Sequence, residues 1–218
     1  DYSSAASDVY KRQGYGFPES HSASFALLAY VSAWLKRHHT AAFYVGLLNS
    51  QPMGFYSPSQ LIQDAQRHHI MVLPVDVNHS GWDHQILSQG KHQQPPIRLG
   101  LRLVKGLSES AGQRIQAAQH IRPFADIADL RRRAGLDRGN MEALAAADAL
   151  SSMSGNRYQS HWQTMALEEH RPLLPADTGL HHRTSDETTI ATPALAEDVI
   201  ADYQSTGLTL RAHPLALL

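Results

Sequence analysis

Between Glu19 and His38 the chain carries apolar side chains on nearly every face of a predicted helix. The breakers Gly16 and Pro18 come directly before it and hold the preceding segment extended. A helix that is apolar on almost all sides is usually covered by neighbours on several faces. We therefore expect a buried helix here. Its two apolar stripes are Phe25, Leu28 and Leu35 with Ser32, and Leu27, Tyr30, Val31 and Trp34.

Other helices are predicted where apolar residues recur at helical spacing between start and stop signals. Ser57 as N-cap, Pro58 in the first turn and Gln60 completing a capping box begin one of them. Gly135 ends another, and Thr192 is expected to cap the last. The predicted helices fall within residues 41–49, 57–69, 108–119, 123–135, 136–150 and 192–207.

Strand signals are few. Residues 70–80 read as a short strand that Pro74 makes irregular. Ile97 to Val104 alternates apolar and other residues, which is the period of a strand with one buried face. Gly81 to Pro96 and Ser151 to Thr192 are polar and are expected to be loop or linker. The predicted fold class is mainly α with a few short β-strands.

Composition excludes some classes of site. The 218 residues include 42% hydrophobic residues, enough for a core, and 19 Lys and Arg against 20 Asp and Glu, so net charge indicates no partner. No cysteine is present, which excludes disulfides and thiolate metal sites. The 14 histidines are scattered and include three adjacent pairs, whose side chains diverge on a helix, so they are expected at the solvated surface.

The ends of the chain look unnatural. Residues 1–13 contain DVYKRQ, which fits no apolar period and can be back-translated as a sequencing adapter. The last residues, LRAHPLALL, stop within an apolar run. We expect a fragment of a longer protein, cut near Gly14, with no readable secretory signal.

A glycine turn between Val104 and Ile115 is a candidate phosphate site. Backbone N–H groups around Gly106, Leu107 and Ser108 would point outward near a helix start, with Lys105 and Arg114 beside them. The alternative is an ordinary packing turn in which Gly106 is only a helix cap. A second helix-turn-helix follows, with three arginines at 131–133 just before its turn, and two adjacent units would give two contacts across a duplex.

The start of the first helix allows a similar pair of interpretations. Ser20 and His21 could donate hydrogen bonds to a phosphate there, aided by the helix dipole. The alternative is a polar cap with His21 merely exposed, and the neighbouring Glu19 favours it.

Catalytic motifs are not visible. The carboxylates Asp76, Asp83, Asp126 and Asp129 are scattered, with capping expected for Asp126 and solvation for Asp129. We find no Asp-x-Asp pair, Walker loop or His-Glu zinc motif, so no catalytic residue and no metal ligand is predicted.

Several long segments together carry a resemblance to a known family. YGFPESHSASFALLAYVSAWLKRHHTAAFYVGLLNSQPMGFYSP, VLPVDVNHSGWD, IRLGLRLVKGLSE and RPFADIADLRRRAGL occur in this order, followed by EDVIADYQSTGLTLRAHPLALL. Together they resemble the bacterial C-family DNA polymerase III alpha subunit. The Pro-Glu before Ser-His is closer to its error-prone, translesion branch than to the main replicase.

The resemblance implies a division of the chain and a role for each part. Residues 14–93 would be the C-terminal part of the polymerase fingers, 94–155 a tandem helix-hairpin-helix that grips duplex DNA, and 156–218 a linker and the start of the following region. Tyr15, Ser20 and His21 would lie near the phosphates of the incoming deoxynucleoside triphosphate. Glu19 would stand where the main replicase has a lysine, and so would remove a positive charge there. Ser108 stands where the first hairpin of the family usually has a second glycine.

The resemblance also implies what lies elsewhere. The palm with its Mg²⁺-binding aspartates would lie upstream and the OB-fold downstream, so this chain alone would be inactive. The whole enzyme would extend primers in translesion synthesis after DNA damage, in the cytoplasm, with the sliding clamp and mutasome accessory proteins. The rival hypotheses are a non-catalytic helix-hairpin-helix DNA-binding or repair-scaffold protein and a helical adaptor without DNA affinity.

Overall fold

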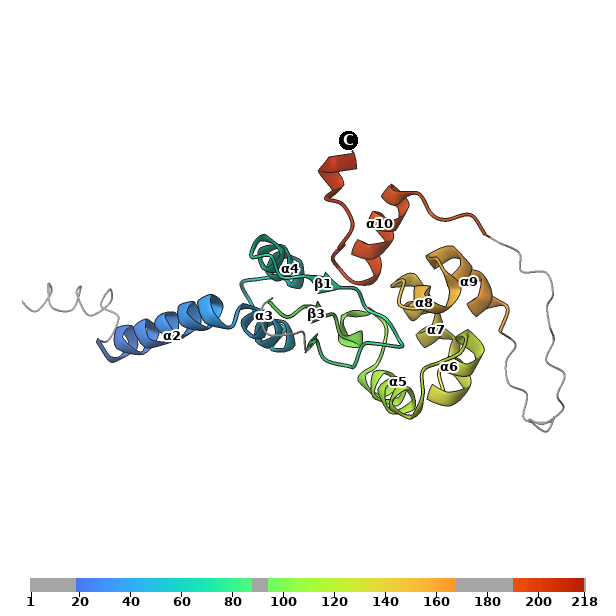
Figure 1. Ribbon diagram of the computed structural model, residues 1–218, viewed down its shortest axis with the longest axis horizontal. Coiled ribbons are helices and arrows are strands. Elements are labelled where there is room, and N and C mark those ends of the chain that lie inside the picture. Colours follow the sequence, from blue (N-terminus) through green and yellow to red (C-terminus); the bar gives the residue numbers. More distant parts are fainter. Residues whose placement is uncertain (1–18, 88–93, 168–189, 218) are drawn as a thin grey trace, which may run out of the picture.

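The computed structural model describes residues 19–87, 94–167 and 190–217 and shows a mostly helical chain with three two-residue strands in that part (Figure 1). This confirms the predicted fold class. The α-helices are α2 (Glu19–His38), α3 (Thr40–Asn49), α4 (Pro58–Arg67), α5 (Glu109–Ile121), α6 (Ile127–Ala134), α7 (Arg138–Ala146), α8 (Ser151–Ser154), α9 (Arg157–Met165) and α10 (Leu195–Ser205). Two 3-10 helices, η1 (Leu101–Leu103) and η2 (Pro214–Leu217), complete the helical elements described.

The predicted start and stop signals hold for most helices. Ser57 caps α4, and Gln60 completes the capping box by accepting from the Ser57 backbone. Asp126 caps α6, and Gly135 ends it in the left-handed region at φ 59°. The last helix differs, because α10 begins at Leu195 with Ala194, not Thr192, at its N-cap, where Glu197 accepts from the Ala194 N–H.

The small sheet has the order β1-β3-β2. Strand β1 (Val72–Leu73) is parallel to β3 (Ile97–Arg98), with Val72 opposite Ile97. Strand β2 (Gln85–Ile86) is antiparallel to β3 and pairs Ile86 with Ile97. The prediction of an unbroken loop from Gly81 to Pro96 is therefore wrong at β2.

The predicted strand from Ile97 to Val104 ends after two residues. Gly100 follows β3 so closely against another loop that an added Cβ would lie 2.4 Å from the Trp82 carbonyl oxygen. The chain then turns into η1, whose Leu101 is fully buried. The alternation of apolar residues predicted a longer strand. Buried residues on both sides of the bend, such as Ile97, Leu99 and Leu101, give the same alternation without a continuous strand.

The predicted linker from Ser151 to Thr192 is also partly wrong. Helices α8 and α9 occupy its first part, and α9 packs on α7. The polar composition predicted a linker, but several of these polar residues cap helices or make buried hydrogen bonds. Asn156 caps α9, and Ser160 is completely buried.

One hydrophobic cluster joins segments from most of the chain. It contains Leu48 of α3, Ile62 of α4, Ile115 of α5 and Leu144 of α7, together with Leu208 after α10. Trp82 packs against this cluster and reaches α5 at Gly112, where an added Cβ would lie 2.3 Å from the indole. The hairpin region is therefore supported by both the N-terminal helices and the C-terminal segment.

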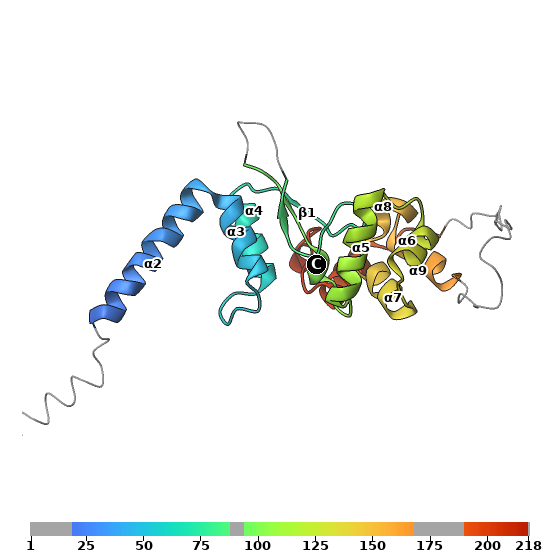
Figure 2. The ribbon, with the colours of Figure 1, turned by 90° about the horizontal axis from the view of Figure 1, so that it is seen from below.

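Helix α2 is formed as predicted, but the expected burial is wrong. It projects away from α3 and α4 (Figure 2), and Tyr30, Leu27 and Leu28 are 69%, 64% and 60% exposed. Its C-terminal end is tied to the body, where the Lys36 ammonium lies 2.7 Å from the Asp64 carboxylate of α4. The periodicity of the sequence indicates which apolar side chains of α2 favour burial. No neighbouring element among the described residues covers most of them.

Within the described residues, no helix is both long enough and apolar enough to span a bilayer.

Candidate nucleic-acid interface

The first hairpin is the turn from Lys105 to Ser108 between η1 and α5. Gly106 adopts φ 86°, a conformation that side-chain-bearing residues rarely take. Leu107 is buried and anchors the turn in the core, while Ser108 is exposed at the start of α5. The Ser108 hydroxyl accepts from the Ala111 N–H at 3.2 Å. The sequence thus builds a turn that is fixed on its inner side and open to solvent on its outer side.

This hairpin start has the electrostatics of an anion site. The first N–H groups of a helix have no intrahelical acceptor and lie at the positive end of the helix dipole. The neutral Ser108 cap adds no charge. Glu109 in the first turn opposes an anion, and its carboxylate accepts from Gln113 at 2.9 Å. The net balance favours a phosphate only with nearby cations.

The second hairpin repeats the first with one change. Gly135 again has positive φ, Leu136 is again buried, and Asp137 takes the place of Ser108 as the N-cap of α7. The Asp137 carboxylate accepts from the Asn140 N–H at 2.7 Å. A charged carboxylate at this point repels phosphate, so the two hairpins differ electrically although their geometry is shared. The paired motifs Gly-Leu-Ser and Gly-Leu-Asp are visible in the sequence, and a comparison of their last residues would have revealed this difference in charge.

The two cations predicted beside the first hairpin make contacts within the protein. Lys105 donates from its ammonium to the carbonyls of Tyr203 and Gln204 at the end of α10, at 2.9 and 3.0 Å. Arg114 donates from Nε to the Ala134 carbonyl at 2.8 Å and from Nη2 to the Gly135 carbonyl at 3.3 Å. Each residue has more N–H donors than these bonds use. Their role towards phosphate stays a prediction.

Asp129 corrects the expectation of a solvated carboxylate. It is buried and ion-paired to Arg122, Arg132 and Arg133 at 3.0–3.1 Å. Burial raises the pKa of Asp129, but hydrogen bonds from Arg133, the Ala125 N–H and Arg132 outweigh it, so the pKa lies below its ordinary value. Two of the three arginines at 131–133 thus stabilise the connection between α5 and α6.

Of the three predicted nucleotide-side residues, the structure describes the side chain of His21 alone. Tyr15 lies outside the described residues, and so does the side chain of Ser20. His21 is exposed on α2, and its ring centroid lies 4.4 Å from that of Phe25. The N-terminal end of α2 points away from α5 (Figure 2), and a role of His21 beside the nucleotide stays a prediction.

The remaining carboxylates serve local structure. Asp76 accepts from the Asn78 N–H, Asp83 pairs with Arg102 at 2.8 Å, and Asp126 caps α6. No group of three or more His, Asp or Glu that could hold a metal ion occurs in the described part of the chain. These residues therefore do not fit a Mg²⁺ centre.

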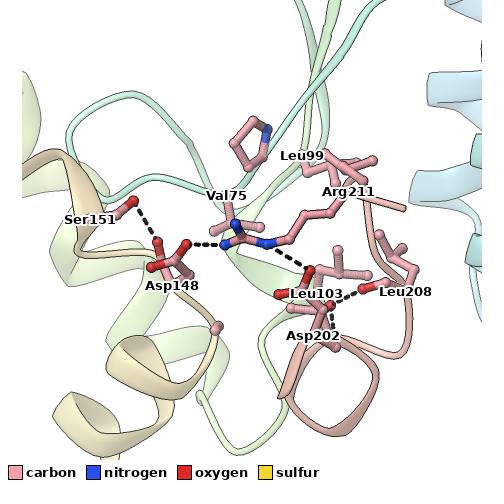
Figure 3. Close-up of a pocket in the computed structure, with 12 residues that line it drawn as sticks. Val75, Leu99, Leu103, Asp148, Ser151, Asp202, Leu208 and Arg211 are labelled. Carbon is pink, nitrogen blue, oxygen red and sulfur yellow. Dashed lines mark hydrogen bonds and ion pairs between the residues drawn. The ribbon is translucent and has the colours of Figure 1, made fainter. Parts of the chain in front are cut away.

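A cluster of charged residues joins α9, α10 and the turn after α7, and the sequence patterns did not predict it. Arg211 lies between Asp148 and Asp202 at the edge of a cavity of about 300 Å³ (Figure 3). Arg157 is buried and pairs with Asp198 and Asp202. We call these five residues the α10 clamp. Spacing could not predict it, because its members come from segments more than 40 residues apart.

Burial raises the pKa of Asp148, against the lowering effect of Arg157 and Arg211. The cavity is lined by Pro74, Val75, Leu99, Leu103, Ala147, Asp148, Ser151, Asp202, Thr206, Leu208, Leu210 and Arg211.

Comparisons with known proteins agree with this geometry. Residues 69–160 match the family described as helix-hairpin-helix motif. The chain is 52% identical over 206 residues to an error-prone DNA polymerase of Teredinibacter turnerae, covering 94% of this chain and 20% of that protein. It is 52% identical over 204 residues to one of Bordetella parapertussis and 48% identical over 204 residues to one of Pseudomonas aeruginosa, covering 94% of this chain and 19% of each.

The chain therefore spans about one fifth of the length of these curated relatives. The predicted resemblance is confirmed at this level: over nearly its whole length the chain matches one segment of the error-prone DNA polymerases, and that segment carries a helix-hairpin-helix motif.

Proposed function

We propose that this chain is the part of an error-prone DNA-directed DNA polymerase that grips duplex DNA behind the catalytic centre. The observation that carries the proposal is the first hairpin, where a positive-φ glycine, a buried leucine and a neutral serine cap open the N-terminus of α5 to solvent. The match to error-prone polymerases supports this role over that of a stand-alone helix-hairpin-helix protein.

The proposed grip is independent of base sequence. Main-chain N–H groups at the start of α5 bind phosphate oxygens, and Lys105 beside the turn supplies positive charge. Asp137 makes the second hairpin the weaker of the two phosphate contacts. Because the contacts are to the backbone, affinity falls steeply as salt rises.

The wider roles are proposals for the whole protein. We propose primer extension in translesion synthesis after DNA damage, with Mg²⁺ held by residues outside the described part of this chain. Residues 14–93 would belong to the fingers, with Tyr15, Ser20 and His21 near the deoxynucleoside triphosphate, and residues 94–155 to the DNA grip. We further propose a cytoplasmic setting, and the sliding clamp and mutasome proteins as partners. This chain alone would not extend a primer.

The grip is tested by placing a negative charge at the first hairpin without removing its cap. Ser108→Asp keeps a good N-cap, because aspartate and serine are about equally effective there. We expect affinity for a short duplex, measured by fluorescence anisotropy at low salt, to fall about tenfold, or about 1.4 kcal/mol.

The matched control is Ser57→Asp, the same change at the N-cap of α4, which should bind like the unmodified chain. Equal affinity for all three proteins would contradict the hairpin assignment. Weakening by both variants would show a general charge effect and contradict it as well.

A further inference from the structure

Helix α10 ends directly against the first hairpin. The Lys105 N–H donates to the Ser205 carbonyl at 2.9 Å, and its ammonium donates to the carbonyls of Tyr203 and Gln204. These carbonyls belong to the last turn of α10, nearly 100 residues later in the chain. An added Cβ at Gly207 would lie 3.8 Å from the Lys105 ammonium, so the close approach continues past the helix end.

The contact restricts an otherwise flexible cation. The last carbonyls of a helix lack intrahelical donors and lie at the negative end of its dipole, where a lysine ammonium is stabilised. An ammonium has three N–H donors, and α10 accepts two. Lys105 is itself exposed, so the third donor remains available to a ligand beside Gly106. A pre-ordered side chain loses less freedom when it binds.

The α10 clamp holds this helix end in place. The Arg157 guanidinium, whose side chain is 3% exposed, lies 2.6 Å from the Asp198 carboxylate and also pairs with Asp202. From the other side, Arg211 lies 2.6 Å from Asp148 and 3.3 Å from Asp202 (Figure 3). It also lies 3.1 Å from Asp198. The clamp therefore joins α10 to α9 and to the turn after α7.

We propose that α10 is a positioning element of the DNA grip: the clamp seats α10, and the end of α10 holds Lys105 in place to bind a backbone phosphate of duplex DNA at the first hairpin. The inference rests on the function proposed above. It adds a contribution from residues 195–211, which lie beyond the matched helix-hairpin-helix motif at residues 69–160.

The test compares two single variants with their combination in the 218-residue chain. Lys105→Gln removes the proposed phosphate contact, and Arg211→Gln loosens the clamp. Duplex affinity is measured across a series of salt concentrations. We expect each variant to reduce the slope of log affinity against log salt by about one unit. The double variant should match the single variants, because Arg211 acts through Lys105.

Three further proteins sharpen the comparison. Arg67→Gln removes one positive charge from the exposed end of α4 and should keep the full salt slope. Arg211→Lys keeps the charge and should recover part of the lost affinity, and it carries the comparison if Arg211→Gln does not fold by circular dichroism. Ser108→Asp reports on the hairpin independently of α10.

The outcomes separate this inference from the proposed function. If Lys105→Gln weakens binding while Arg211→Gln and Arg211→Lys bind like the unmodified chain, α10 does not position Lys105. Additive losses in the double variant would likewise overturn the inference. If Lys105→Gln and Ser108→Asp both bind normally, the DNA grip itself is in the wrong place.

Discussion

At the scale of single residues, the hairpins depend on a few buried polar groups. Asp129 is 6% exposed and forms ion pairs with three arginines. One of them, Arg133, also donates hydrogen bonds to the carbonyls of Ala118, Arg122 and Pro123. Arg133 in addition lies over the Phe124 ring, 4.7 Å from its centroid. This carboxylate therefore organises the connection between α5 and α6 rather than facing solvent.

Asp129→Asn should lower the free energy of unfolding by about 2 kcal/mol, because it leaves the half-buried Arg133, whose side chain is 14% exposed, without its charged partner. The loss is measured by urea unfolding at neutral pH. As a control, Asp83→Asn should change stability by less than about 0.5 kcal/mol, because the Asp83 carboxylate that pairs with Arg102 is 57% exposed.

The difference between Asp129→Asn and the unmodified chain also depends on pH. The pKa of Asp129 is lowered in the folded state. Its contribution is therefore complete above the unfolded value of about 3.9 and is lost as pH falls through the lower folded pKa. A constant difference down to the acid limit would contradict the buried ion pairs.

His84 is a second buried polar group, and it should make stability fall between about pH 6.5 and 4. Burial, followed by the charge of Arg102, lowers the pKa of His84 to about 4. Its Nδ1 accepts from the Gly100 N–H at 3.1 Å, so the neutral ring fits the site. The unfolded state binds the proton more tightly, so unfolding becomes easier as pH drops through this range.

The maximum slope is about 1.4 kcal/mol per pH unit, and it is measured by urea unfolding across the range. His84→Asn should remove this part of the slope. If the variant and the unmodified chain show the same pH dependence, His84 is not buried as described.

At the scale of elements, small residues decide which helices can approach a neighbour. Gly112 admits the Trp82 ring onto α5, whereas an added Cβ at Gly46 in α3 would meet nothing within 4 Å. The two glycines therefore have opposite roles although both lie within helices.

Gly46→Ala should stabilise the chain by about 0.5–1 kcal/mol, since alanine loses less backbone entropy in a helix. Gly112→Ala should destabilise it by about 1–3 kcal/mol, because Trp82 must move. Thermal unfolding of both variants checks the pair, and a shift of the same sign in both would refute the packing of Trp82 on α5.

Elements with strong local signals could be predicted from sequence, and those set by distant contacts could not. The caps at Ser57, Asp126 and Gly135 are local and were correctly placed. The break at Gly100 depends on a loop that reaches it from residues 82–83, which no spacing reveals. In the candidate site, sequence identified the Gly106 turn, but it missed the α10 contacts of Lys105 because Tyr203 and Gln204 lie far along the chain.

At the scale of the whole molecule, two regions differ in how much of their apolar surface is packed against the rest of the described chain. The hairpins share one core with α3, α4 and the segment after α10, while α2 extends away with most of its apolar residues exposed (Figure 2). The chain spans about one fifth of its curated relatives. The proposed DNA grip is thus placed on the well-packed part and does not depend on the exposed helix.

The central claim is that main-chain N–H groups of the first hairpin bind duplex phosphate. It is tested most directly by NMR, following the backbone amide signals of the ¹⁵N-labelled chain as a short duplex is added. We predict that the largest changes fall on Gly106, Leu107, Ser108 and Glu109, with smaller ones at Gly135 to Arg138. If DNA binds while these signals stay unchanged and those of another surface move, the account is wrong.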